Sequence, residues 1–151
     1  MHVITIGRSD DIGPEVEDGV VVHRLDLPRY LRGTPWFSYI SRKAVRGICR
    51  RFEVNLLEAH GYHSYGIDAN SVGVPVVAQL ASSYRGAWDR LLAFSIAELP
   101  PREQFHRLLY YPGVMIPIEK WICSRASSIV VSCEHVANSL ARYYSVEQSR
   151  I

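Results

Sequence analysis

The chain has few cysteines, and those it has are not arranged as metal ligands or disulfide partners. Cys49, Cys123 and Cys133 form no Cys-x-x-Cys pair and stand in no cluster with histidines. The sequence therefore predicts neither a zinc site nor a disulfide framework, and a reducing compartment is the simpler setting. No run of residues is long and apolar enough to cross a bilayer. The N-terminus also lacks the cationic start and apolar middle of a signal peptide, so we expect a cytoplasmic protein.

Several strong signatures of catalysis and nucleotide binding are missing as well. No Gly-x-Gly-x-x-Gly follows a predicted strand, and there is no P-loop. There is no Gly-x-Ser-x-Gly nucleophile elbow either. His60 and His63 are close in sequence, but nothing else completes a metal set. These absences argue against the commonest nucleotide-binding enzymes and against a serine hydrolase with that elbow.

What the chain does have is the composition of an ordinary globular domain. Its 151 residues are 48% hydrophobic and 21% charged, with a net charge of +2, which is enough to bury a core. The charges are unevenly spread: residues 10–18 hold five acids and no base, whereas eight bases and one acid lie from Arg24 to Arg51. Such asymmetry indicates a binding face.

Short apolar runs alternate with helical patterns along the chain. Strands are predicted at residues 2–6, 20–25, 54–62, 74–80 and 128–132, and helices at 37–52, 64–71, 88–97, 102–111, 116–125 and 133–144. The stretches 10–18 and 27–35 are predicted loops, and the strand at 20–25 is expected near a sheet edge. Pro100-Pro101 and Pro112-Gly113 are expected to interrupt the helical stretches, and Ser132 is expected to cap the last helix. The alternation predicts an α/β fold with a Rossmann-like, doubly wound parallel sheet.

The predicted helix at 37–52 has one apolar face and one basic face. The apolar positions Phe37, Ala44, Val45, Ile48 and Phe52 share one side. The bases gather on the other side, at Arg42, Lys43, Arg46 and Arg50. The simplest interpretation is a solvated outer face. The functional alternative is a contact with anionic lipid, with Trp36 and Phe37 as interfacial anchors. Nucleic acid is disfavoured, because aromatic residues do not interleave with these bases.

Polar residues follow three of the predicted strands. His60, Gly61 and Tyr62 end the strand at 54–62, Ser82 to Arg85 follow the strand at 74–80, and Ser132 and Glu134 follow the last one. Parallel strands align their carboxyl ends, so we expect these groups at one edge of the sheet, where ligands of open α/β sheets bind. A cleft there suits a polar, hydroxyl-rich ligand, with Tyr84 at its border and Arg85 available for a phosphate or carboxylate. The plainer alternative is a sheet edge with a few satisfied polar groups.

Three passages carry a resemblance to a known family. They are residues 18–25 (DGVVVHRL), residues 54–62 with 73–77 (VNLLEAHGY and GVPVV), and residues 126–134 (ASSIVVSCE) with the helix to 144. In this order, over nearly the whole chain, they resemble the N-terminal domain of retaining GT-B glycosyltransferases of family 4.

The resemblance implies transfer of a sugar from a nucleotide-sugar donor to an acceptor, between two Rossmann-like domains. His60 matches the family's histidine beside the donor sugar, which implies that it binds the sugar and helps stabilise charge as the bond to phosphate breaks. Ser82, Tyr84 and Arg85 match a loop bordering the cleft, and we assign them acceptor contacts, although the family often has a histidine there. No metal and no cofactor are expected.

The resemblance also implies parts that precede and follow this sequence. The family opens with a strand, a glycine-rich loop and a helix ahead of the strand at 2–6, and it continues into a nucleotide-binding domain. We therefore expect residues 1–151 to be a partial N-terminal domain, truncated at both ends and inactive as a transferase by itself. The first strand is central in the usual order, so a gap in the sheet is expected. A homodimer or a complementing chain is the expected response to such free strand edges.

Two other functions compete with this interpretation. One is a non-catalytic module that binds anionic lipid, a sugar or a partner protein, with a peripheral contact at the inner membrane face. The other is a different Rossmann enzyme such as a sugar-nucleotide epimerase, which the missing glycine fingerprint and the missing Tyr-x-x-x-Lys pair disfavour.

Overall fold

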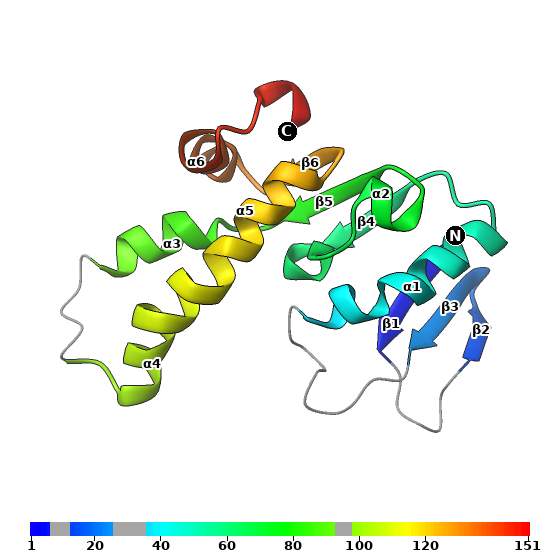
Figure 1. Cartoon of the computed structure of the whole chain (residues 1–151), viewed down its shortest axis with the longest axis horizontal. Coiled ribbons are helices and arrows are strands. Elements are labelled where there is room, and N and C mark those ends of the chain that lie inside the picture. Colours follow the sequence, from blue (N-terminus) through cyan, green and yellow to red (C-terminus); the bar gives the residue numbers. More distant parts are fainter. Residues whose placement is uncertain (7–12, 26–35, 93–97) are drawn as a thin grey trace.

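The structure, a computed structural model, describes residues 1–6, 13–25, 36–92 and 98–151. Within these ranges six strands form two three-stranded sheets, and helices cover and connect them (Figure 1). The predicted loop at 27–35 and the last part of the predicted helix at 88–97 lie outside the described residues. The arrangement is mixed α/β and Rossmann-like, as predicted. None of the described helices has the length and apolarity that crossing a membrane requires.

The first sheet contains a hairpin that the sequence patterns did not predict. β1 (His2–Ile6) runs parallel to β3 (Val20–Leu25), and β2 (Gly13–Glu17) pairs antiparallel on the other side of β3. Part of the acidic stretch 10–18 is therefore a strand, and β3 is the central strand of this sheet, so both predictions were wrong. The cause is the pair Asp18-Gly19, whose φ angles of 48° and 78° form the tight two-residue turn of a β-hairpin.

The second sheet is fully parallel, as predicted. β4 (Leu57–His60), β5 (Val76–Leu80) and β6 (Ser128–Val131) lie in the order β4-β5-β6. β5 is the buried centre, since Val76, Ala78 and Leu80 have almost no exposed surface. β4 is shorter than the predicted strand at 54–62, because the chain turns after His60 into one 3-10 turn, η3 (Gly61–Ser64).

A short capped helix replaces most of the predicted helix at 64–71. α2 (Ala69–Val72) begins at a capping box in which Asp68 and Ser71 exchange hydrogen bonds of 2.8 Å. It ends at Gly73, whose φ of 86° is the left-handed conformation typical of a helix end. The helix therefore ends close to the predicted end at residue 71, whereas the predicted start at residue 64 was wrong.

The helix α1 (Trp36–Arg51) packs through small side chains. Its buried residues are Phe37, Ser38, Ser41, Val45 and Cys49. Ala44, predicted on the buried face, is exposed. α1 and the segment around Gly66 lie very close together. A Cβ atom added at Gly66 would be 2.7 Å from the Tyr39 side chain of α1, so only glycine fits there. Val45 and Cys49 then join the strands and α2 in one core cluster with Ala59, Ile67, Val72 and Val76.

A long helix begins at the first predicted break and continues through the second. α4 (Pro101–Phe105), the π-helix η5 (His106–Met115) and α5 (Ile116–Arg125) follow one another without a gap. Pro101 starts the helix at a position where its missing N–H does no harm. Pro112 was predicted to end a helix, but it lies inside the π-helix, whose wider turns accommodate the proline ring. Figure 1 shows this helix running diagonally from α4 to β6.

The second core cluster lies between this long helix, the parallel sheet and α6 (Glu134–Tyr144). Its buried members include Ala78, Leu80, Ile118, Ile122, Ile129, Val136 and Leu140. Val136 and Leu140 lie on the buried face of α6. The two core clusters hold the β4-β5-β6 sheet rigidly in place, and the carboxyl ends of its strands are left at one edge.

Candidate functional site

The carboxyl edge of the β4-β5-β6 sheet contains a small cavity. The parallel register places His60 opposite Gln79, and Leu80 opposite Val131. A cavity of about 240 Å³ opens there, lined by His60, Gly61, Gln79, Leu80, Ala81, Val131 and Ser132. Of the predicted site residues, His60, Gly61 and Ser132 are thus brought together. Tyr62, Ser82, Tyr84, Arg85 and Glu134 are not among the lining residues.

His60 is the accessible ionisable group of this edge cavity. Its side chain is 70% exposed, and Nε2 lies 3.5 Å from a carboxylate oxygen of Glu58. Gly61, with φ of 57°, turns the chain away into η3, so the imidazole stays exposed at the end of β4. An imidazole in this position can donate or accept a hydrogen bond at the edge of the cavity.

Ser132 stabilises the edge instead of capping the next helix. Its hydroxyl donates to the Ala81 carbonyl at 2.8 Å, which joins the chain segments that leave β5 and β6. The cap position of α6 is Cys133, so the predicted Ser132 cap was wrong. Glu134 lies in the first turn of α6, as predicted, and is exposed.

The exposed Cys133 thiol next to this edge is a feature that the sequence patterns missed. Hydrogen bonds from the Val136 backbone and the Ser132 side chain lower the pKa of the thiol. The lowering follows from the position at the start of α6, where the helix dipole and free N–H groups favour an anion.

The predicted loop residues Tyr84 and Arg85 lie in a helix. α3 (Tyr84–Leu91) starts earlier than the predicted helix at 88–97, because Ser83 caps it by accepting from the Gly86 N–H at 3.1 Å. Ser82, just before the cap, is exposed. The predicted loop therefore extends only from Ala81 to Ser83.

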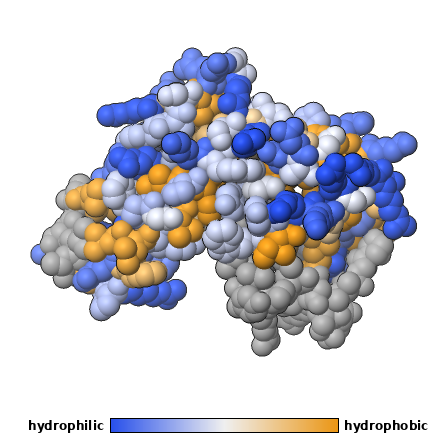
Figure 2. Space-filling view, in the orientation of Figure 1, coloured by the Kyte–Doolittle hydropathy of each residue, from blue (hydrophilic) through white to orange (hydrophobic). Residues whose placement is uncertain are grey.

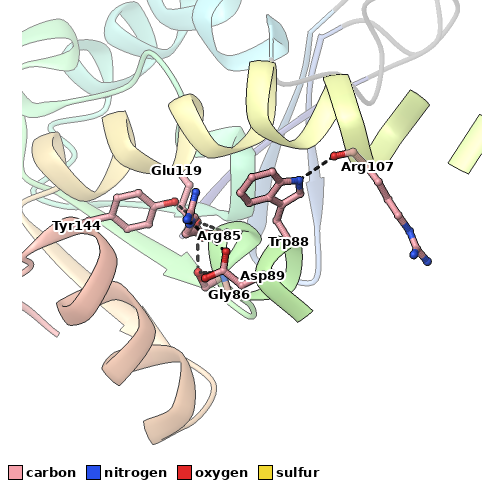
Figure 3. A network of polar contacts seen from close by, with 8 residues as sticks. Arg85, Gly86, Trp88, Asp89, Arg107, Glu119 and Tyr144 are labelled. Carbon is pink, nitrogen blue, oxygen red and sulfur yellow. Dashed lines mark hydrogen bonds and ion pairs between the residues drawn. The ribbon is translucent and has the colours of Figure 1, made fainter. Parts of the chain in front are cut away.

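A buried carboxylate binds the start of α3. Glu119 on α5 is 1% exposed, and it accepts hydrogen bonds from the backbone N–H groups of Tyr84 at 2.8 Å and Arg85 at 3.0 Å. It also accepts from the Ser83 hydroxyl at 3.3 Å and from the Tyr144 hydroxyl at 2.5 Å. Figure 3 shows Glu119 between α3 and Tyr144 of α6. This network was not predicted, although one acid among the apolar residues of the helix at 116–125 could have indicated it.

Arg85 is occupied by neighbours on the helices. Its guanidinium lies 3.3 Å from Asp89, and it stacks over the rings of Trp88 at 4.8 Å and Tyr143 at 5.5 Å. It therefore binds other helical side chains and does not reach the edge cavity, where the sequence suggested a contact with phosphate or carboxylate.

The two remaining tyrosines belong to the packing around the edge. Tyr62 is half-buried and lies against His63, with ring centroids 4.4 Å apart. Burial, together with the nearby Tyr62, Glu119 and Tyr111, raises the pKa of Tyr84 to about 12. Its hydroxyl is therefore neutral at ordinary pH and can act as a hydrogen-bond donor.

The basic face of α1 is a second candidate surface. Lys43, Arg46 and Arg50 are exposed, and the Arg42 guanidinium lies 3.9 Å above the Tyr39 ring. Trp36 is 45% exposed beside them, but Phe37 is buried and cannot be the predicted anchor. Figure 2 shows hydrophilic residues gathered over the right-hand part of the molecule, where α1 lies. The described residues contain no group of three or more His, Cys, Asp or Glu side chains that could hold a metal ion.

The family model described as the glycosyl transferase 4-like domain matches residues 1–151, the full length of the sequence. A search of curated proteins found no match.

Proposed function

Because the chain belongs to the glycosyl transferase 4-like domain family, we propose that it takes part in moving a sugar from a nucleotide-sugar to an acceptor. A glycosyltransferase-type function follows from the family itself. The finer proposal is that the sugar binds at the carboxyl edge of β4-β5-β6 and that a second domain binds the nucleotide. The nucleotide-sugar enters as a substrate, and the proposal needs no cofactor.

The observation that carries this proposal is the exposed His60 at the edge cavity. Cleavage of a glycosyl–phosphate bond develops charge on the sugar and on the leaving phosphate, and aligned donors and dipoles stabilise it. An imidazole can supply such a hydrogen bond, and Gln79 and Ser132 add polar atoms to the same cavity. Ser82 and Tyr84, which follow β5, are proposed to contact the acceptor from outside the cavity. Arg85 would join them only by giving up its ion pair with Asp89.

A titration tests the sugar site without requiring turnover. We would add UDP-glucose or GDP-mannose to the 15N-labelled chain and follow the His60 ring and the Gly61 and Ser132 amides by NMR. The expected result is a saturable shift confined to residues of the edge cavity. His60→Ala should weaken binding about tenfold, the effect of losing one good hydrogen bond. His106→Ala is the matched control, because His106 lies on η5 and does not line the cavity. Shifts that persist unchanged in His60→Ala would refute the site.

A second candidate function rests on the basic face of α1. Exposed Tyr39 and Ile40 lie next to these bases, and Trp36 adds an aromatic ring that suits a membrane interface. On this alternative the chain is a non-catalytic module that binds anionic lipid at the inner membrane face. Sedimentation with vesicles of phosphatidylserine and phosphatidylcholine tests it. The triple charge reversal of Arg42, Arg46 and Arg50 to Glu should abolish binding, and binding that is equal on pure phosphatidylcholine would contradict it.

A further inference from the structure

The strand β4 has one paired edge and one free edge. The Leu57 N–H donates to the Pro75 carbonyl at 3.0 Å, so the backbone of Leu57 faces β5. Successive residues of a strand direct their backbone groups to opposite sides. The backbone groups of Glu58 and His60 therefore face away from β5. In the described residues β4 pairs with β5 alone, so these groups have no strand partner.

The strand β1 is free on its outer side in the same way. The Met1 carbonyl accepts from the Val21 N–H at 3.0 Å, so the backbone of Met1 faces β3. By the same alternation the backbone groups of His2 and Ile4 face away from β3. Within the described ranges β1 pairs with β3 alone. Each sheet thus ends in an exposed ladder of donors and acceptors.

Two cavities lie between these free edges. The larger, of about 590 Å³, is lined by Met1, His2, Val3, Ile4, Ile48, Cys49, Phe52, Glu53, Val54, Leu56, Leu57, Glu58 and His60. The smaller, of about 220 Å³, has Ile4 and Thr5 on one side, Leu57 to His60 on the other, and Ser38, Ser41 and Val45 of α1 beside them. α1 contributes to both cavities, so it covers the space between the sheets.

The strands β1 and β4 run in the same direction across this space. The larger cavity joins the first residues of β1 to residues 53–58, and the smaller joins Ile4 and Thr5 to Ala59 and His60. The beginnings of the strands therefore lie near each other, as do their ends. A single strand placed between them would pair with the backbone groups of both edges at once.

We propose that this space binds one extended, apolar segment of a complementing polypeptide, which joins the two sheets into a continuous sheet. Apolar side chains on the segment would cover Met1, Val3 and Leu56, which are 80%, 38% and 55% exposed. The charges favour basic residues at the ends of the segment, because Glu53 and Glu58 line the larger cavity and its described lining includes no lysine or arginine.

The charges also argue against a second copy of this chain as the occupant. In the described residues the outer edge strands are β2 and β6; each already pairs with one neighbour and can offer only one edge to the gap, and β2 also carries the exposed acid Glu15. Inserting β2 between the sheets would place this acid near Glu53 and Glu58, where like charges repel. A basic, apolar strand meets no such repulsion.

A labelled peptide tests the proposal on the 151-residue chain. The probe is an acetylated, fluorescein-labelled peptide with about five alternating valines and isoleucines between lysines, the length of an ordinary strand. We expect saturable binding by fluorescence anisotropy and about tenfold slower hydrogen exchange at the amides of His2, Ile4, Glu58 and His60. The same peptide with N-methyl groups at alternate residues should not bind, because it cannot form the ladder. Neither measurement depends on a sugar, so failure here leaves the proposed function untouched.

Two variants of one exposed residue separate strand pairing from simple apolar contact. Glu58→Pro removes an N–H that faces the gap, and Glu58→Val removes the same carboxylate but keeps the N–H. We expect Glu58→Pro to weaken peptide binding about tenfold and Glu58→Val to leave it unweakened. Absence of binding, or binding without protection of the four amides, overturns the proposal. A dimer of the chain that protects these amides without peptide also overturns it, because the occupant is then a second copy.

Discussion

Replacing Glu119 by leucine should destabilise the protein strongly, because the carboxylate satisfies several buried donors at once. It accepts from the Tyr84 and Arg85 N–H groups and from the Ser83 and Tyr144 hydroxyls. Leucine can accept none of these bonds, and each buried donor left without a partner costs about 1–3 kcal/mol. Tyr84 and Tyr144 are only half-buried, so water can hydrogen-bond to some of the freed donors and offset part of the lost stability. We expect Glu119→Leu to lower the free energy of unfolding by about 3–5 kcal/mol.

Urea and thermal unfolding measure this loss. For a domain of this size, about 2–4 °C of melting temperature corresponds to each kcal/mol, so Glu119→Leu should lower the midpoint by about 6–20 °C. Glu119→Gln keeps the size and one acceptor oxygen and should cost about half as much. The matched control is Glu103→Gln, an exposed acid 3.7 Å from Arg107, which should change stability by less than about 0.5 kcal/mol. If Glu119→Leu were as stable as the unmodified chain, apolar packing would fully replace the network, and the reasoning would be refuted.

Three further predictions concern single residues. Gly66→Ala should lower the free energy of unfolding by about 2–4 kcal/mol, because φ is 77° and the new Cβ would lie 2.8 Å from the backbone of α1. Gly73→Ala, where the space is open, should lower it by about 1 kcal/mol, and urea unfolding measures both values. Iodoacetamide near pH 7.5 should alkylate Cys133 first and leave Cys123 of the folded chain unmodified, as followed by mass spectrometry. The reason is that the pKa of the Cys133 thiol is lowered, whereas burial raises the pKa of the Cys123 thiol to about 12. Burial lowers the pKa of His23 in the folded state, so the unfolded chain binds more protons below about pH 6.5, and stability should fall from pH 7.5 to 5.5. His23→Gln should flatten that pH dependence of the urea midpoint, and an unchanged dependence would contradict it.

The parallel half of the fold was predictable because its signals are local and strong. Apolar runs bounded by turn residues gave β5 and β6, and the 3.6-residue period gave α1 and α6. The order of strands in the β4-β5-β6 sheet follows the usual rule that consecutive parallel strands are neighbours. From this arrangement the position of His60 at the edge of the sheet could be predicted from the sequence alone.

The remaining features depend on contacts that no local pattern reveals. The hairpin at Asp18-Gly19 was missed because acidic residues dominate β2, although the dipeptide itself is a turn signal. The helix continues past Pro112 because a π-helix forms there, which depends on packing along its whole length. Glu119 acts on residues more than thirty positions away in sequence, so its role becomes visible only when α3, α5 and α6 are assembled.

His60 lines the edge cavity and both cavities between the sheets. Its side chain borders the proposed sugar, while its backbone faces the gap. A strand that fixes β4 would therefore restrict the imidazole as well, and a sugar that orders the imidazole would favour the strand in return. Thermodynamic linkage requires these two effects to be equal in free energy. On these two proposals, the gap between the sheets would act as an effector site for the carboxyl edge, with His60 shared by both.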